Sequence, residues 1–282
     1  MSSINYDLPE PAGIVPEILL DLDHYTEGPV VNNAGHLFFT DLAGQNIWCW
    51  KENKAKIWAK GIRPNGQALM ADGSLLVCDS SAACIVQYDV YGKIKDKKGS
   101  GLIDGTEVRC PNDIAIDPEN GFYFTDSVRH VGAVFFVGFS GQERLIADNI
   151  DFANGIAISP DGQALYIAES YQNRILVMQL DSPGHIKNME VFANLPVNQS
   201  NSPTGNLPDG LALDALGRLW VAHYGMQAVQ VLSASGDLLA TYDTGIPLTS
   251  NLCFMGNDII VTGGFGEPGP GRVSRLPIFK TY

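Results

Sequence analysis

The stretch PNDIAIDPENGFYFTD, residues 111 to 126, contains an amide side chain, a short apolar run, a turn and a second run rich in aromatic residues. Two short strands separated by turn residues are typical of a β-hairpin. The pattern recurs along the whole chain, because an acidic or amide residue opens a short apolar run six times. These openers are Glu27, Asn65, Asn112, Asn154, Asp209 and Asn251, at intervals of 38, 47, 42, 55 and 42 residues. Such spacing indicates a repeat architecture.

Each repeat provides material for four strands. A glycine follows five of the openers by eight or nine residues, which suits a tight turn between the first two strands. These glycines are Gly35, Gly73, Gly121, Gly162 and Gly217. Further runs, such as residues 46–51 and 56–60, supply a third and a fourth strand. Four strands in a repeat of roughly 40 to 50 residues describe a propeller blade. The sequence therefore predicts an all-β, six-bladed β-propeller with four-stranded antiparallel blades around a central channel.

The predicted propeller accounts for the chain from end to end, so we expect residues 1–282 to form a single domain. The run Glu17 to Leu22 precedes the first opener and is free to pair with strands of the last blade near Arg272 to Phe279. Such an exchange would close the ring and remove two open sheet edges.

Charge and composition limit the kinds of molecule that this protein is expected to bind and the compartment in which it is expected to occur. The chain has 31 acidic and 18 basic residues and a net charge of −13, which disfavours nucleic acid and anionic membranes. The basic run Lys93 to Lys98 is expected to be a solvated loop. No signal peptide or membrane-spanning run is present, and five scattered cysteines favour reduced thiols, so a cytoplasmic protein is expected. The sequon at Asn198 is a chance match on this interpretation.

In a propeller the innermost strand of each blade lines the channel, so the six openers are expected to converge although they are far apart in sequence. All six carry side-chain oxygens, and three or four of these at one depth would bind a hard cation. Calcium is the first expectation, with Zn, Mn, Mg or Fe(II) as substitutes. Any one opener taken alone is better explained by ordinary turn chemistry, in which its side chain bonds to nearby backbone. Two buried carboxylates around one axis, however, would be costly without a cation.

A second ring of polar residues follows the openers by fourteen or fifteen positions: Asp41, Asp79, Asp126, Glu169 and His223. Their place at the end of the second strand favours capping of turns over direct catalysis. His223 and Tyr224 are the better candidates for substrate binding, because histidine exchanges protons near neutral pH. The polar insertion from Asn198 to Asn206 could overhang the channel or be a plain surface loop.

Several stretches together resemble the gluconolactonase and regucalcin (senescence marker protein) superfamily, which includes drug-responsive bacterial lactonases. They are Glu27-Gly-Pro29, residues 111–117 with 121–126, residues 153–159 and residues 208–214. The resemblance implies a propeller with one divalent cation held by Glu27, Asn154 and Asp209, with Asn112 as a fourth ligand or a substrate contact. Arg109 and Asn65 are further substrate-binding candidates. Related lactonases carry an arginine two residues before the asparagine, whereas Arg109 lies three before Asn112.

The same resemblance implies metal-assisted hydrolysis of a small sugar or aliphatic lactone, with no nucleic-acid or membrane partner. Asp209 would take a proton from the attacking water and return it to the ring oxygen; attack by a metal-bound water is the other route. Two alternatives stay open. One is a phosphotriesterase resembling diisopropyl fluorophosphatase, and the other is a non-catalytic propeller in which the ion is structural.

Overall fold

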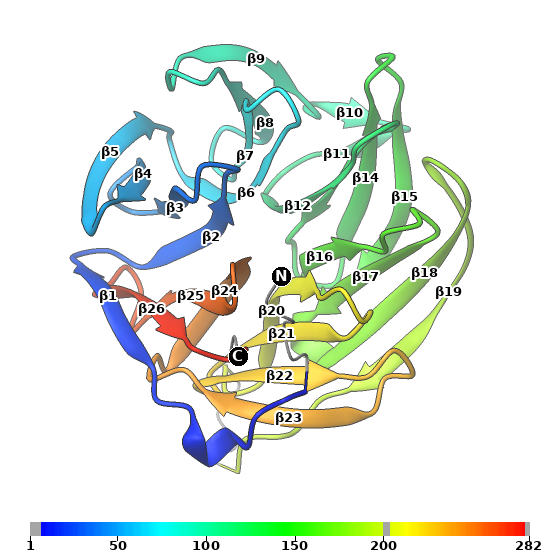
Figure 1. Cartoon of the computed structure of the whole chain (residues 1–282). Coiled ribbons are helices and arrows are strands. Elements are labelled where there is room, and N and C mark those ends of the chain that lie inside the picture. Colours follow the sequence, from blue (N-terminus) through cyan, green and yellow to red (C-terminus); the bar gives the residue numbers. More distant parts are fainter. Residues whose placement is uncertain (1–6, 200–203, 280–282) are drawn as a thin grey trace, which may run out of the picture.

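A computed structural model describes residues 7–199 and 204–279. It contains six four-stranded antiparallel sheets arranged like blades around a central channel (Figure 1). The predicted six-bladed β-propeller is thereby confirmed.

The first three blades follow the chain from the inside outwards. Blade I contains β2 (Thr26–Val31), β3 (Leu37–Asp41), β4 (Asn46–Lys51) and β5 (Lys54–Lys60). Blade II contains β6 (Pro64–Leu69), β7 (Leu75–Asp79), β8 (Cys84–Tyr88) and β9 (Ile94–Lys98). A hairpin of β10 (Leu102–Ile103) and β11 (Thr106–Glu107) precedes blade III, which contains β12 (Pro111–Asp117), β13 (Gly121–Asp126), β14 (Gly132–Gly138) and β15 (Glu143–Ile150).

The remaining blades complete the ring. Blade IV contains β16 (Ala153–Ile158), β17 (Ala164–Glu169), β18 (Arg174–Ser182) and β19 (His185–Asn194). Blade V contains β20 (Leu207–Leu213), β21 (Leu219–Tyr224), β22 (Ala228–Leu232) and β23 (Leu238–Asp243). Blade VI takes three strands from the C-terminal part of the chain, β24 (Leu248–Met255), β25 (Asp258–Gly264) and β26 (Gly271–Leu276), and its fourth, β1 (Glu17–Leu22), from near the N-terminus. Short 3₁₀ turns lie at Pro11–Gly13 and Ser170–Gln172.

The pairing of β1 with β26 confirms the expected closure of the ring. The strands are antiparallel, with Leu20 opposite Val273 and Leu22 opposite Gly271. The leucines of β1 also pack on a cluster that spans blades I and VI and includes Phe39 and Ile260. Closure therefore depends on backbone pairing and on apolar burial together.

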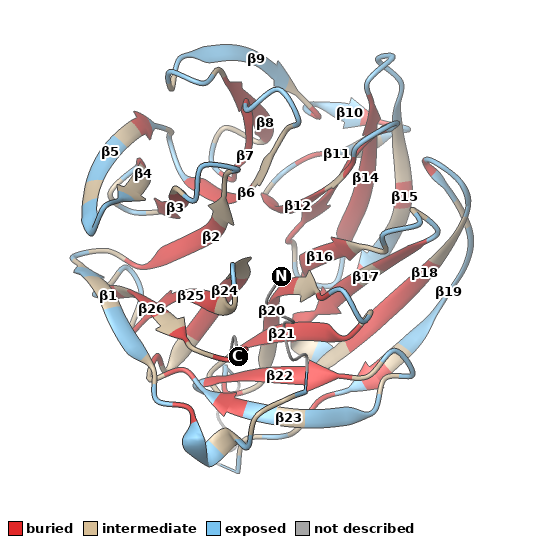
Figure 2. Cartoon of the chain, viewed as in Figure 1, coloured by how far each residue is buried: buried red, intermediate tan, exposed pale blue. Residues whose placement is uncertain are grey.

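The core lies between adjacent blades. The second and third strands carry large apolar side chains on both faces and are buried throughout in several blades, whereas β9 and β23 at the periphery are largely exposed (Figure 2). In one such cluster, Tyr123 and Phe136 of blade III pack with Ile167 of blade IV, and the two aromatic rings are 4.8 Å apart between centroids. Burial on both faces explains why these strands read as continuous apolar runs.

Two local expectations were wrong. The lysine-rich run from Lys93 to Lys98 is not a loop but supplies the exposed outermost strand of blade II. Gly121 has no positive φ, unlike Gly35, Gly73, Gly162 and Gly217 at the corresponding turns. It begins β13, where a Cβ would lie 2.3 Å from the carbonyl oxygen of Val137. Glycine is required there for close strand approach, not for turn geometry.

Each of the six innermost strands contains a register break beside its opener. In β2 the break lies between Glu27 and Val30, and in β16 between Ala153 and Ile156. A β-bulge of this kind bends the strand and re-aims one side chain. The repeated break therefore turns the opener towards the channel while the apolar residues after it keep their places in the blade.

Two further observations concern the described residues. No helix among them has the length and apolar character needed to cross a bilayer. All five cysteines are free thiols.

Candidate active site at the mouth of the channel

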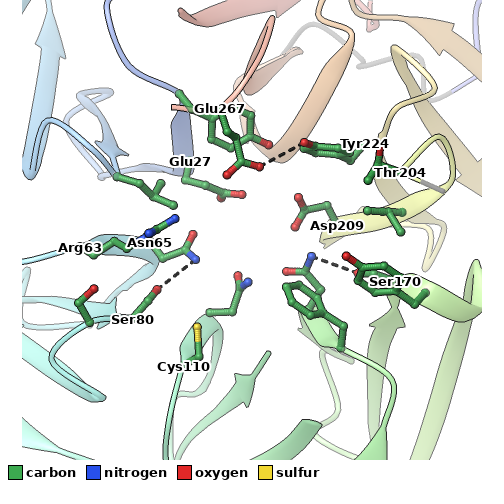
Figure 3. Close-up of a pocket in the computed structure, with 18 residues that line it drawn as sticks. Glu27, Arg63, Asn65, Ser80, Cys110, Ser170, Thr204, Asp209, Tyr224 and Glu267 are labelled. Atoms are coloured by element: carbon green, nitrogen blue, oxygen red, sulfur yellow. Dashed lines mark hydrogen bonds between the residues drawn. The ribbon is translucent and has the colours of Figure 1, made fainter. Parts of the chain in front are cut away.

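One end of the channel opens into a cavity of about 430 Å³. Five of the six openers line it and contribute oxygen-bearing side chains from five different blades (Figure 3). They are Glu27, Asn65, Asn112, Asn154 and Asp209. The structure thus gathers residues spread over more than half of the sequence into one polar pocket.

Two of the amides leave an oxygen without a partner. Asn154 donates from Nδ2 to Oγ of Ser170 at 3.2 Å, and Asn65 donates to Oγ of Ser80 at 3.4 Å, while Oδ1 of each amide is buried and accepts no hydrogen bond. An unpaired buried acceptor costs about 1–3 kcal/mol. The serines fix the amide groups so that both oxygens are available to a ligand.

The carboxylates of the cavity are held in an environment that disfavours their charge. Burial and the nearby Asp113 raise the pKa of Glu27 to about 8. Burial, followed by the charges of Glu27 and Asp113, raises the pKa of Asp209 well above its usual range. Both groups would otherwise be ionised at neutral pH. The site therefore favours either bound protons or a bound cation.

These donors fit a hard divalent cation. Glu27 and Asp209 supply carboxylate oxygens, and Asn154 supplies an amide oxygen that has no other partner. Such all-oxygen sets suit calcium or magnesium better than softer metals. Among the residues that the structure describes, no three Asp, Glu, His or Cys side chains are grouped as a metal site. Any ion here must therefore be held by amides as well as by acids.

Asn251, the sixth opener, does not line this cavity. It pairs with Thr262 directly after the register break in β24. A Cβ added at Gly210 would lie 2.1 Å from Oδ1 and 2.7 Å from Cα of Asn251. Asn251 therefore lies at the same depth in the channel as Gly210, the glycine that follows the opener of blade V. Its amide donates to Glu27 at 3.2 Å and faces Asp113 at 3.5 Å. The expected convergence of all six openers at one depth therefore fails in blade VI.

Asp113 is a buried acid that the repeat pattern missed. It directly follows the opener Asn112 and lies at the same depth in the channel as Asn251, a position that glycine occupies in blades I, II, IV and V. Burial raises the pKa of Asp113 to about 6. Backbone N–H groups of Ile114 and Ile156 donate to its carboxylate at 2.9 and 3.4 Å. A comparison of the position after each opener would have singled it out, since only blade III has an acid there.

The second polar ring mainly holds the loops that lead into the openers. Asp79 accepts from the N–H groups of Ile62 and Arg63 at 2.7 and 3.0 Å, and Glu169 accepts from Asp151 N at 2.9 Å. Asp126 likewise accepts from the N–H groups of Arg109 and Cys110. These contacts agree with the capping interpretation of the ring.

His223 and Arg109 lie elsewhere than expected. His223 is fully buried, its Nε2 lies 3.0 Å from Oδ1 of Asn173, and its Nδ1 lies 3.3 Å from Nε2 of Gln230. Burial lowers its pKa to about 4. Arg109 has an exposed side chain. Neither is among the residues of the cavity wall, whereas Tyr224 is. His223 and Tyr224 are consecutive residues of β21, so their side chains point to opposite faces of the strand. The histidine is therefore buried, while the tyrosine lines the cavity.

Three other wall residues, Tyr25, Arg63 and Glu267, come from loops and have no repeat signal. Tyr224 donates from its hydroxyl to Glu267 at 3.2 Å (Figure 3). Tyr25 and Arg63 also line the cavity. Of the 198–206 insertion, Thr204 lines the cavity, while residues 200–203 lie outside the described residues. The side chain of Asn198 donates to the carbonyl of Gly225 at 2.7 Å.

The fold and cavity define a six-bladed propeller with an acid and amide site at one end of its channel. Residues 25–262 match the model of the SMP-30/Gluconolactonase/LRE-like region, and the chain belongs to this family. Lactonase drp35 of Staphylococcus aureus is 28% identical over 267 residues, covering 84% of this chain and 80% of that protein.

Solved structures agree in fold. A gluconolactonase from Xanthomonas campestris superimposes with a TM-score of 0.81 at 24% identity, covering 95% of this chain and 91% of that chain. A calcium-binding regucalcin from Agrobacterium tumefaciens superimposes with a TM-score of 0.78 at 19% identity, covering 94% of each chain.

Proposed function

We propose that this protein is a divalent-metal-dependent hydrolase that opens a small sugar or aliphatic lactone. The observation that carries the proposal is the pairing of two buried carboxylates with raised pKa values and an amide oxygen without a partner in one cavity. Membership of the family and the similarity to a protein named a lactonase support the reaction class. The similarity to a calcium-binding regucalcin supports calcium as the ion.

Glu27, Asn154 and Asp209 would hold the ion, with Asn112 as a fourth ligand or a contact to substrate. When bound, the ion supplies a Lewis acid for the lactone carbonyl oxygen. The aromatic side chains on the wall, among them Tyr25 and Phe152, would exclude water from the parts of the cavity that they line. Exclusion of water strengthens every charge interaction within it.

Asp209 is proposed to move the proton. Its carboxylate takes a proton from the attacking water as the water oxygen bonds to the carbonyl carbon. The ring C–O bond then breaks, and the same proton passes to the leaving ring oxygen, which yields a hydroxy acid. Burial and neighbouring acids raise the pKa of Asp209, so the protonated form needed for the second step is accessible. A base that also binds the ion must release part of that contact to act.

The five free thiols support a reducing compartment such as the cytoplasm. The strongly negative net charge supports a small-molecule substrate over nucleic acid.

The test combines metal analysis of the purified protein with lactone hydrolysis before and after chelation. Activity should disappear with the metal and return on addition of calcium. Asp209→Asn should lower kcat by about 10²- to 10⁴-fold while the circular dichroism spectrum is unchanged. Asp148→Asn, a change of the same chemistry at an exposed position of β15, is the matched control. An Asp209→Asn protein with unaltered turnover would contradict the assignment, and preferential hydrolysis of a phosphotriester would favour the related reaction class.

A further inference from the structure

Arg63 is the one basic side chain among the described residues that line the cavity. Its backbone is firmly placed at the start of blade II. The N–H of Arg63 donates to Oδ1 of Asp79 at 3.0 Å, and its carbonyl accepts from the N–H of Ser80 at 3.0 Å. The side chain therefore extends from an anchored position, although it belongs to a loop.

The guanidinium has no acidic partner within ion-pair distance among the described residues. Asp79, at the end of β7, already accepts from backbone N–H groups of Ile62, Arg63 and Ala82. Glu267, which lines a smaller pocket together with Arg63, accepts from the hydroxyl of Tyr224. A guanidinium offers five N–H donors in a fixed plane. Those donors remain available to a molecule in the cavity.

Arg63 and Asp209 lie on opposite sides of the cavity (Figure 3). Asn65 and Ser80 share the Arg63 side, whereas Thr204 and Tyr224 share the Asp209 side (Figure 3). The charge of Arg63 also acts on the neighbouring Cys110. Burial and the charge of Asp126 raise the pKa of the Cys110 thiol, and the positive charge of Arg63 offsets part of that rise. The cavity thus has a proton-transfer end and a separate cationic end.

We propose that Arg63 determines substrate specificity by binding an oxygen substituent of the lactone, a hydroxyl or a carboxylate, that points away from Asp209. A hydrocarbon against this wall would remove water from the guanidinium and give no hydrogen bond in return. An oxygen acceptor replaces that water, and a carboxylate can accept two parallel N–H bonds. Arg109 is not among the residues that line the cavity, so it is assigned no such role.

This inference rests on the proposed lactonase activity. The test uses the calcium-loaded protein with three lactones of one ring size: γ-butyrolactone, α-hydroxy-γ-butyrolactone and γ-butyrolactone-γ-carboxylate. Arg63→Gln should lower kcat/KM for one or both substituted lactones by about 10- to 100-fold, mainly through KM, because a hydrogen bond to a charged group is lost. Hydrolysis of unsubstituted γ-butyrolactone should stay within about twofold, since that ring makes no such bond.

Arg63→Lys distinguishes the two substituents. It should recover part of the activity on the carboxylate, in a salt-sensitive way, but little on the hydroxyl compound. Calorimetric titration with the ring-opened hydroxy acids gives a readout without turnover and should show the same loss of affinity. Arg144→Gln on β15 is the matched control, with the melting temperature of each variant checking the fold.

An equal fall for all three lactones, or a loss in Arg109→Gln with none in Arg63→Gln, would overturn the assignment of Arg63. Failure of the wild-type protein to hydrolyse any of them, with or without calcium, would instead count against the proposed function.

Discussion

Glu27 shows how one residue is made functional by its surroundings. The residue is only 4% exposed, and its carboxylate accepts from the N–H of Gly28 at 2.7 Å and lies near Asp113. Two hydrogen bonds compensate only part of the cost of burying the charge, so the pKa rises to about 8. The remaining cost of burying the charge is removed only when the carboxylate binds a cation or a proton.

The raised pKa predicts opposite pH responses of stability and of metal affinity. Between the ordinary value of 4.5 and about 8, folded metal-free protein keeps a proton that the unfolded chain releases. Its free energy of unfolding should therefore fall as pH rises through this window. Calcium displaces the proton, so its affinity should rise by up to about tenfold per pH unit from pH 6 to 8. Calorimetry in buffers of different ionisation enthalpy would count the released protons, and a dissociation constant that is flat over this range would refute the prediction.

At the scale of the strand, the bulge and the glycine after the opener act together. The break in register turns the opener into the channel, and the following glycine lets neighbouring inner strands approach closely. At Gly155 a Cβ would lie 2.0 Å from the carbonyl oxygen of Asp209. The backbone of blade IV thus sets the position of the proposed proton carrier in blade V.

Gly155→Ala is expected to force β16 and β20 apart. Overpacking of this kind costs about 1–3 kcal/mol, and the shift should also weaken calcium binding, because Asn154 and Asp209 move relative to each other. Thermal unfolding and a calcium titration measure the two effects. The control is Gly13→Ala, where a Cβ meets no atom within 4 Å. Unchanged calcium affinity in Gly155→Ala would show that the close approach does not position the site.

At the scale of the molecule, the ring is closed by β1. This strand lies about 250 positions in sequence from its partner β26 but supplies the outer edge of blade VI. Two exposed ion pairs also join β1 to β26, one between Arg272 and Asp21 and one between Arg275 and Glu17. Exposed pairs contribute only about 0–1 kcal/mol each. Backbone pairing and the half-buried leucines of β1 therefore account for most of the closure.

Deletion of residues 1–22 should expose the edge of β26 and part of the blade I and VI core. We expect a large fall in melting temperature and a concentration-dependent tendency to associate through the open edge. Asp21→Asn with Glu17→Gln removes the ion pairs and keeps the strand, so it should change the free energy of unfolding by about 1 kcal/mol or less. Light scattering and thermal unfolding compare the two. Equal destabilisation by both changes would assign closure to the charges.

Local sequence was enough for much of this fold. Strand runs such as Phe122 to Asp126, positive-φ glycines such as Gly73 and the spacing of the openers are encoded within a few residues, because each blade repeats one hairpin unit. The pairing of Glu17 to Leu22 with the last blade also followed, since an open ring leaves two edges to cover. That residues 1–282 form one domain stays a prediction.

The wall of the cavity was harder to predict. Arg63 and Glu267 come from loops whose paths depend on contacts such as Asp79 with the Ile62 and Arg63 N–H groups, and no repeat marks them. Arg109, the predicted substrate contact, is not among the residues that line the cavity, because sequence distance from an opener does not fix the direction of a loop side chain.

The sequence by itself determined the number of blades, the order of their strands and which oxygen-bearing residues begin five of the six inner strands, because these depend on periods of hydrophobicity and turn chemistry along the chain. Only the tertiary structure decided the depth of each side chain in the channel. A one-residue difference at a bulge moved Asn251 below the cavity, and strand alternation left Tyr224 on its wall while His223 was buried. The physical reason is that depth and direction depend on register between strands from different blades, which no local pattern encodes.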